Sequence, residues 1–476
     1  MQPSHVYRII RKRSPGQRAA GLPPLGLAFL ALLTVLLTVG IFAAAAAYSD
    51  LTVGLPPIEQ LAYLLDPQEG TLLQPTRLFD RSGQRLLYSL ENPGVSRVYG
   101  RIDPQAENAI SPQLVRATIL SVQPDFWESS GYRLTAPTDP QPATIAERLV
   151  LRLLLWNEPP STRRALRMRL LAAQVVARYG RSQVLEWYLN SENYGHLAVG
   201  PHSAAQLYFG KPAGQLTLAE AMLLAAVAEA PALNPLDAPT AARGQAQTLL
   251  ERLAAEGLIT SEEMTQADPA GLRFQPAPPQ ARSTAAAFSH LVINQLAQRY
   301  GLDVVERGGW RVITSLDDEL QTELVCSTRA QLQRVYGLPA AAQKPDGTDC
   351  LAARLLPTLP PGGGDWPEGL SISGLIFDPQ TSQVLALSGD TSLSGETDLA
   401  IGHAPGTMLA PFIAASALTG GLTPASLVWD IAEGLPPEVL AEAGEVLTFR
   451  GPLRLRSALA GGRAAGLARL LLQTGQ

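Results

Sequence analysis

Three hydrophobic patterns divide the chain. An uncharged apolar run occupies residues 25–48, apolar positions recur with a helical period through residues 108–270, and strand-like segments begin after residue 306. At about 1.5 Å per residue, the first run is long enough to cross a hydrocarbon core of roughly 30 Å. The patterns therefore predict a transmembrane helix, then a mainly α-helical domain, then a mixed α/β domain.

Turn signals and composition complete the division. Turn residues at 80–83 and at 379–382 each separate two apolar runs and predict β-hairpins. The predicted parts are a basic tail (1–24), the transmembrane helix (25–48), a stalk with short strands (49–100), the helical domain (101–270), a linker region (271–305) and the α/β domain (306–476).

The distribution of basic residues predicts how the chain sits in a membrane. Five basic residues precede the apolar run: Arg8, Arg11, Lys12, Arg13 and Arg18. No Lys or Arg follows the run until Arg77. The positive-inside rule then predicts a single-pass protein of the cell membrane, with a cytoplasmic N-terminus and most of the chain outside. The alanines at 43–47 also resemble a signal-peptide cleavage region, but the run exceeds the roughly 7 to 15 apolar residues of a signal peptide. We therefore expect a retained anchor.

Composition excludes several function classes. Hydrophobic residues make up 46% of the chain and charged residues 17%, which excludes a wholly disordered protein. The net charge is −5 and the sequence has no basic stripe, so nucleic acid is not an expected partner. Two cysteines, Cys326 and Cys350, are too few for a four-thiolate zinc site, and whether they form a disulfide stays open. The five histidines lack metal-ligand spacing, so no metal site is expected.

Longer motifs carry a family resemblance. The segments VLEWYLNSENYG (184–195) and LYFGKPAGQLTLAEAMLLAAVAEAPALNPL (207–236) resemble the family 51 peptidoglycan glycosyltransferase domain of class A, bifunctional penicillin-binding proteins. The segments VITSLDDELQ (312–321), FDPQTSQVLALSG (377–389) and APGTMLAPFIAASALTGGLTPASLVWD (404–430) are similar to the first half of their transpeptidase domain. The resemblance implies a lysozyme-like helical glycosyltransferase domain, followed by an incomplete α/β transpeptidase-like domain.

The same resemblance locates the first active site and shows that its motifs are degenerate. In the family a Glu-Asp pair supplies the general base that deprotonates the acceptor sugar, and these positions hold Val122 and Gln123 here. The family's second functional Glu corresponds to Met168. Neither Val122 nor Met168 can accept a proton. Other matched or nearby polar positions are candidates for substrate binding: Thr144, Arg148, Arg164, Glu186, Asn190 and Lys211.

Two interpretations of this site remain open. Either the sugar-transfer chemistry is lost and the surviving motifs serve packing, or Asp125, Glu128 or Glu147 has taken over the role of the base. Misplacing a catalytic group by about 1 Å can cost on the order of a hundredfold in rate. We therefore favour the loss of catalysis.

The second active site is also incomplete. The family's Ser nucleophile corresponds to Thr407 and its Lys, three residues on, to Ala410. No lysine follows Lys344, so the Lys-Thr-Gly motif cannot occur within this sequence. Transpeptidase activity is therefore not expected.

These observations predict a non-catalytic binding or scaffolding homologue, a pseudoenzyme, in peptidoglycan synthesis of the bacterial cell wall. An active glycosyltransferase that polymerises lipid II with a relocated carboxylate is the alternative, and a truncated gene product is a third interpretation. The resemblance implies the cytoplasmic membrane, lipid II or glycan strands, and other cell-wall synthesis proteins as partners. No cofactor is expected, unless an active glycosyltransferase uses a divalent cation.

Overall fold

The computed structural model describes residues 24–133, 139–278, 283, 285–340, 342–359, 369–392, 395–396, 406–433 and 449–474. Its chain divides into two compact units, residues 1–397 and 398–476, which are described separately below. The first unit includes residues 306–397, although the sequence pattern predicts that they belong to the α/β domain together with residues 398–476.

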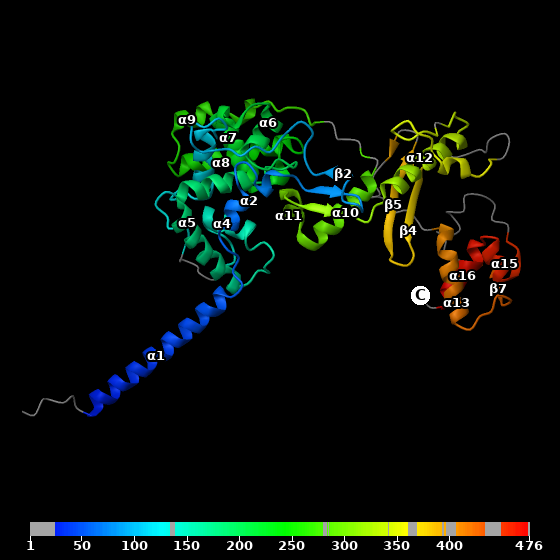
Figure 1. Ribbon diagram of the computed structural model, residues 1–476, viewed down its shortest axis with the longest axis horizontal. Helices are drawn as coiled ribbons and strands as arrows, with labels where there is room; N and C mark the ends of the chain where they lie inside the picture. The colour runs from blue at the N-terminus through cyan, green and yellow to red at the C-terminus, as the bar shows by residue number, and fades with distance from the viewer. Residues whose placement is uncertain are drawn as a thin grey trace, which may run out of the picture. The chain divides into compact units, whose positions relative to one another are not determined.

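The N-terminal helix α1 (Pro24–Thr52) matches the predicted membrane segment and extends four residues beyond it (Figure 1). Its stretch Ala28–Thr52 is long and apolar enough to cross a membrane, and its most apolar window buries nothing against the protein. The hydroxyls of Thr34 and Thr38 donate to backbone carbonyls within the helix, so these polar groups are satisfied without water. The helix is therefore chemically suited to a lipid environment.

A helical domain follows, as predicted. Its elements are α2 (Gln60–Leu64), η1 (Thr71–Leu73), α3 (Pro112–Val122), α4 (Ile145–Leu153), α5 (Thr162–Ser191), α6 (Pro201–Phe209), η2 (Ala213–Gln215), α7 (Leu218–Glu229), η3 (Pro231–Leu233), α8 (Pro239–Ala255), α9 (Ser261–Gln266) and η4 (Pro269–Gly271). Helix α7 is apolar around nearly its whole circumference and nine of its twelve residues are buried, which places it at the centre of the core. Helix α5 is interrupted at Gly180, where φ is 80°.

A small sheet joins residues that lie far apart in the sequence. Strands β1 (Arg77–Phe79) and β2 (Leu86–Ser89) form the predicted hairpin, and β3 (Arg311–Ile313) pairs with β1 in parallel. The segment predicted as a linker contains helix α10 (Ala286–Tyr300), and α11 (Leu302–Arg307) follows it. Residues of α10 pack against this sheet, together with Val305 of α11. The segments on either side of the helical domain therefore meet.

The rest of the first unit is a sheet with a helix packed on it. Strands β4 (Ile372–Asp378) and β5 (Gln383–Ser392) form the second predicted hairpin, and β6 (Gly395–Glu396) pairs with β5. Helix α12 (Asp318–Val335) packs on this sheet, where the side chain of Leu324 lies close to the backbone of Gly374. The short helix η5 (Ala352–Leu355) lies beside α12.

The second unit has its own small core. It consists of η6 (Gly406–Leu409), α13 (Ala410–Thr419), the strand pair β7 (Leu427–Asp430) and β8 (Gly451–Arg454), α15 (Leu455–Ala460) and α16 (Ala464–Thr474). Alanines of α13 pack against Val428 and the leucines of α15 and α16. The expected architecture is thus present: one apolar N-terminal helix, a helical domain, and a limited amount of sheet.

Candidate functional site

The start of α4 brings several of the predicted site residues together. Thr144 is the N-cap of this helix: its hydroxyl accepts from the backbone N–H of Glu147 at 3.1 Å and donates to the carbonyl of Gly131 at 2.8 Å. The carboxylate of Glu147 turns back and accepts from the backbone N–H of Ala143 (2.6 Å) and of Arg133 (3.2 Å). This arrangement satisfies free N–H groups at the helix start and before it.

Glu147 is fully buried beside a buried cation. The Nε of Arg169 lies 3.7 Å from its Oε1, and the same guanidinium donates to the backbone carbonyls of Arg133 and Asp139. The backbone at Arg133 and at Asp139, both between α3 and α4, is therefore held by one Glu–Arg pair. The Glu147 carboxylate is thus enclosed by the helix start and this guanidinium, and Glu147 has no surface exposed to solvent.

The positions that the resemblance aligns with the family's carboxylates hold side chains that cannot perform proton transfer. Val122 ends α3 and packs partly buried against the core, and Met168 is fully buried inside α5. Gln123 is buried as well, and its Oε1 accepts from the backbone N–H of Ile145 at 3.0 Å. Gln123 therefore links the end of α3 to the start of α4.

The other two candidate bases are exposed. Asp125 and Glu128 lie in the turn that follows α3. Asp125 forms an ion pair with Arg133 at 2.7 Å, in which both side chains are about half exposed. These carboxylates can reach solvent, and Glu147 cannot.

Arg148 is the next residue of α4. It pairs with Glu229, the last residue of α7, and interacts with the hydroxyl of Tyr188. Burial opposes the charged form of Arg148, but the interactions with Tyr188 and Glu229 outweigh it and raise the pKa of this guanidinium. Arg148 thus remains a cation, but one already paired with a carboxylate.

Glu186 and Asn190 bind the backbone that enters the domain. The Glu186 carboxylate accepts from the hydroxyl of Tyr99 (2.9 Å) and the N–H of Ile102 (3.0 Å). The Asn190 amide accepts from the N–H of Gly100 and donates to its carbonyl, both at 2.7 Å. Burial, and then the charge of Glu186, raise the pKa of Tyr99. Both residues therefore hold residues 99–102 against α5.

Lys211 is held by the start of α7. Its Nζ lies 2.6 Å from Oε2 of Glu220, and Glu220 forms a capping box with Thr217. The ammonium group is mostly buried in this position.

Arg164 lines a cavity that the sequence pattern does not predict, and Glu229, the partner of Arg148, lines the same cavity. This cavity has a volume of about 520 Å³ and is lined by Arg152 and Trp156 at the end of α4, Arg164 in α5, Glu229, and Asp303 and Arg307 in α11. No local motif connects Arg307 to the helical domain, because 143 positions separate it from Arg164 in the numbering. Tertiary contacts bring this segment back, among them the parallel pairing of β1 with β3 and the hydrogen bond from the Thr76 hydroxyl to the carbonyl of Val305, and sequence spacing does not reveal them.

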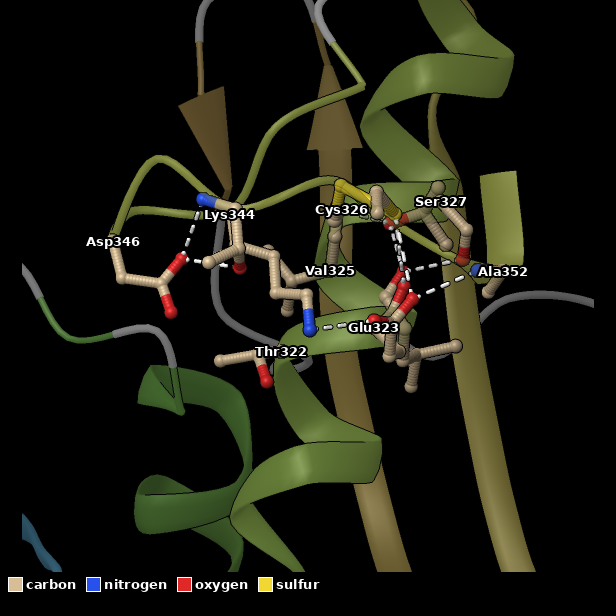
Figure 2. The surroundings of a disulfide bond; sticks show 12 residues. Thr322, Glu323, Val325, Cys326, Ser327, Lys344, Asp346 and Ala352 are labelled. Carbon is tan, nitrogen blue, oxygen red and sulfur yellow. Dashed lines mark hydrogen bonds and ion pairs between the residues drawn. A yellow bond between two sulfur atoms is a disulfide. The ribbon is translucent and has the colours of Figure 1, made fainter. Parts of the chain in front are cut away.

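The transpeptidase positions lie in the second unit. Thr407 belongs to η6, whose side chain at this position lies outside the described residues, and Ala410 begins α13 and is buried in the small core. Lys344 belongs to the first unit, where its Nζ contacts Glu323 at 2.7 Å (Figure 2). At Ala410, the position that the resemblance aligns with the family's lysine, the side chain is a methyl group.

The two cysteines form a disulfide. Cys326 in α12 and Cys350 have Cα atoms 6.2 Å apart and are bonded through their sulfur atoms, which resolves the question left open by the sequence. Figure 2 shows Glu323 beside this bond, where its carboxylate also accepts from the backbone N–H of Ala352 at 2.8 Å. Among the residues that the structure describes, no three His, Cys, Asp or Glu side chains gather as metal ligands would.

Comparisons with known proteins also relate this chain to transglycosylases and penicillin-binding proteins. Residues 142–254 match the family model described as Transglycosylase. Penicillin-binding protein 1A of Escherichia coli is 28% identical over 250 residues (49% of this chain, 29% of the relative), and that of Aquifex aeolicus is 31% identical over 201 residues (41% and 27%). Penicillin-binding protein 2D of Bacillus subtilis is 23% identical over 337 residues (67% and 44%).

The chain spans less than half the length of each of these relatives. A crystal structure of penicillin-binding protein 1A from Haemophilus influenzae aligns with 85% of this chain and 62% of that protein, with a TM-score of 0.30 and 17% sequence identity.

Proposed function

This chain belongs to the class A penicillin-binding protein family, of which it carries the peptidoglycan glycosyltransferase domain, and we propose that it acts there as a non-catalytic homologue. In this role it binds lipid II or glycan strands at the membrane, or holds other cell-wall synthesis proteins there, without polymerising sugars. The apolar helix α1 serves as the anchor in this proposal, and the charge difference across it favours an orientation with the bulk of the chain outside the cytoplasm.

One observation carries the proposal: the positions that the resemblance aligns with the two functional carboxylates are apolar, and Glu147, the buried carboxylate among the candidate substitutes, is already engaged. Val122 and Met168 cannot accept the acceptor proton. Glu147 is held by Arg169 and by two backbone N–H groups, so freeing it would leave a buried guanidinium without its anion. General base catalysis typically contributes about 10² to 10⁴ in rate, and here no suitable group occupies the family position.

The alternative is an active glycosyltransferase with a relocated base. Exposure of Asp125 and Glu128, in the turn directly after Val122, favours these two residues over Glu147 for such a role. Cross-linking is not part of either proposal, because Ala410 stands where the family has lysine.

The experiment measures lipid II polymerisation and lipid II binding with the same detergent-solubilised full chain. We expect binding without glycan product, with or without a divalent cation. In the double variant Val122→Glu/Met168→Glu, which restores both carboxylates, we expect polymerisation to appear. Glycan synthesis by the unmodified chain that disappears in Asp125→Asn or Glu128→Gln would overturn the proposal and identify the base.

A further inference from the structure

Strand β4 forms an open edge of the sheet β4-β5-β6. Within the part of the chain that the structure describes, β4 pairs with β5 on one side and with no strand on the other. An edge strand presents a row of N–H and C=O groups that can pair with another strand. The other described edge strands have two to four residues each, whereas β4 has seven. Strand β4 therefore offers the longest open edge among the described strands.

Edge strands usually carry features that prevent pairing with another chain, and β4 lacks them. Its sequence ISGLIFD contains no lysine, arginine or proline. Its one charged residue, Asp378, accepts from the backbone N–H of Gln380 at 2.9 Å and from the hydroxyl of Thr381 at 2.7 Å, so this carboxylate is held in the following turn. Two register shifts interrupt the pairing with β5, but in both the extra residue belongs to β5. Strand β4 thus keeps the regular alternation of a strand that can accept a neighbour.

One face of β4 is apolar and exposed. Helix α12 packs on the other face, where Leu324 lies close to Gly374. On the open face, Leu375 and Phe377 are 56% and 55% exposed. Leu387, which pairs with Leu375, belongs to β5 and packs in a buried cluster with residues of α10. Helix α10 therefore covers β5 and leaves these two apolar side chains of β4 in solvent.

The strand is complementary to itself. Two copies related by a two-fold axis pair in antiparallel fashion, and a pairing that uses all seven residues places Leu375 opposite Leu375 of the second copy. In this register Phe377 lies opposite Ser373 of the second copy, and Ile376 lies opposite Gly374, so each of these large side chains meets a small one.

The same register keeps like charges apart. The two Asp378 carboxylates lie at opposite ends of the paired strands, about 20 Å from each other at roughly 3.4 Å per residue. This separation exceeds the Debye length of about 8 Å at physiological ionic strength, so the two charges are screened from each other. Other registers that keep the two exposed faces on the same side shorten the overlap of the strands.

We propose that β4 pairs with β4 of a second copy of this chain, so that two three-stranded sheets join into one sheet of six strands. The pairing occupies the open backbone groups of both edges and brings Leu375 and Phe377 of both copies onto one apolar surface. A single strand pair is a small, reversible interface, and anchoring of both copies in one membrane raises their effective concentration. This inference does not depend on whether the chain polymerises lipid II.

Cysteine cross-linking of the full chain in liposomes tests the pairing and its register. Cys326 and Cys350 are bonded to each other, so the unmodified chain is the blank. Opposite residues of antiparallel strands have Cβ atoms about 4.5 to 5.5 Å apart, so mild oxidation should link Leu375→Cys into a dimer. Ser373→Cys should not link to itself, because its two thiols are offset by roughly 13 Å along the strands. A mixture of Ser373→Cys and Phe377→Cys, with tags of different mass, should form the mixed dimer.

A charge at the two-fold axis tests whether this edge drives the association. Leu375→Lys, added to both members of the mixture, places two ammonium groups opposite each other and should lower the yield of mixed dimer roughly tenfold or more. The matched control is Leu355→Lys, at an exposed leucine of η5 outside β4, which should leave the yield unchanged. Circular dichroism spectra establish that each variant is folded.

Three results would each overturn the proposal. The first is a folded Leu375→Cys chain that forms no dimer, which would show that solvent, another segment or another protein occupies the edge. The second is equal linking of Ser373→Cys alone and in the mixture, which contradicts the register. The third is an unchanged yield of mixed dimer with Leu375→Lys, which would show that the copies meet through a different surface.

Discussion

At the scale of single residues, substitutions in the Glu147–Arg169 pair test whether the Glu147 carboxylate is structural or catalytic. Glu147→Ala leaves a buried guanidinium without its counter-charge and two backbone N–H groups without their acceptor. Removing one partner of a buried ion pair typically costs about 3 to 5 kcal/mol, so we expect a loss of this size in the free energy of unfolding. Denaturant unfolding of the full chain, followed by circular dichroism, measures it.

The matched control is Glu128→Ala, because Glu128 is exposed in the turn after α3. It should change the free energy of unfolding by less than about 0.5 kcal/mol. The double variant Glu147→Ala/Arg169→Met should be less destabilised than the sum of the two single variants, since it removes both buried charges. Equal, small effects of Glu147→Ala and Glu128→Ala would contradict the structural role.

At the scale of elements, the loop after α12 should respond to pH. The backbone N–H of Ala352, and then Lys344, lower the pKa of Glu323, and the contact with Glu323 raises the pKa of Lys344. The Glu323 contribution is present above its unfolded pKa of about 4.3 and is lost as pH falls through its lower folded value. The Lys344 contribution is present below about 10.4 and is lost as pH rises through its higher folded value.

Hydrogen exchange of the Ala352 amide reports this directly, because that N–H donates to Glu323. We expect strong protection between about pH 5 and 9, and a loss of protection at about pH 3 beyond the intrinsic change in exchange rate. In Glu323→Gln the same amide should show little dependence on pH over this range. Identical protection of the unmodified loop at pH 3 and pH 6 would refute the role of this carboxylate.

The disulfide constrains the same loop. Cys326 and Cys350 are 24 positions apart, and closing a loop of this length restricts the unfolded chain by about 3 kcal/mol in the entropic description. We expect Cys326→Ser/Cys350→Ser to destabilise residues 318–356 by roughly this amount and to leave the helical domain unaffected. Limited trypsin digestion should then cleave at Lys344 before any site in α3–α8. Unchanged cleavage at Lys344 would show that the ion pair alone holds the loop.

Elements were predictable where their signals are local. The apolar run predicted α1, and turn residues between two apolar segments predicted both hairpins. The parallel pairing of β1 with β3 was not predictable, because it joins segments more than 200 positions apart and neither strand exceeds three residues. The sequence pattern predicts a linker where helix α10 lies, because the Pro-rich residues before it resemble a connector and its apolar face becomes recognisable only against the sheet.

The candidate site was likewise predictable only where a local sequence motif marks a residue. Motif matching identified the residues that hold α4, α5 and α7 in position, including Thr144, Asn190 and Lys211. It could not separate packing from binding, because a motif records a residue and not its hydrogen-bond partner. The sequence does not indicate Arg307 as a site residue, because its closeness to Arg164 depends on tertiary structure.

At the scale of the whole molecule, the disulfide and the anchor make one joint prediction about topology. Basic residues precede α1 and none follows it until Arg77, so the N-terminus should be cytoplasmic and residues 53–476 should lie outside. Cysteines oxidise in that compartment and stay reduced in the cytoplasm. We therefore expect the thiols of Cys326 and Cys350 to resist maleimide labelling in denatured whole-cell protein until a reductant is added.

Replacing Arg8, Arg11, Lys12, Arg13 and Arg18 by glutamine, with two lysines introduced directly after Thr52, should reverse the charge difference across α1. In this variant a larger share of the protein should retain its C-terminal part in the cytoplasm, with both cysteines reduced and open to labelling. The control replaces Arg334 and Arg354, which are distant from α1 in the sequence, by glutamine and should leave the thiols oxidised. Free thiols in the unmodified protein would place the disulfide-bearing unit in the cytoplasm and contradict the predicted orientation. Oxidised thiols in the charge-reversed variant would show that the charges on the two sides of α1 do not set the orientation of the chain.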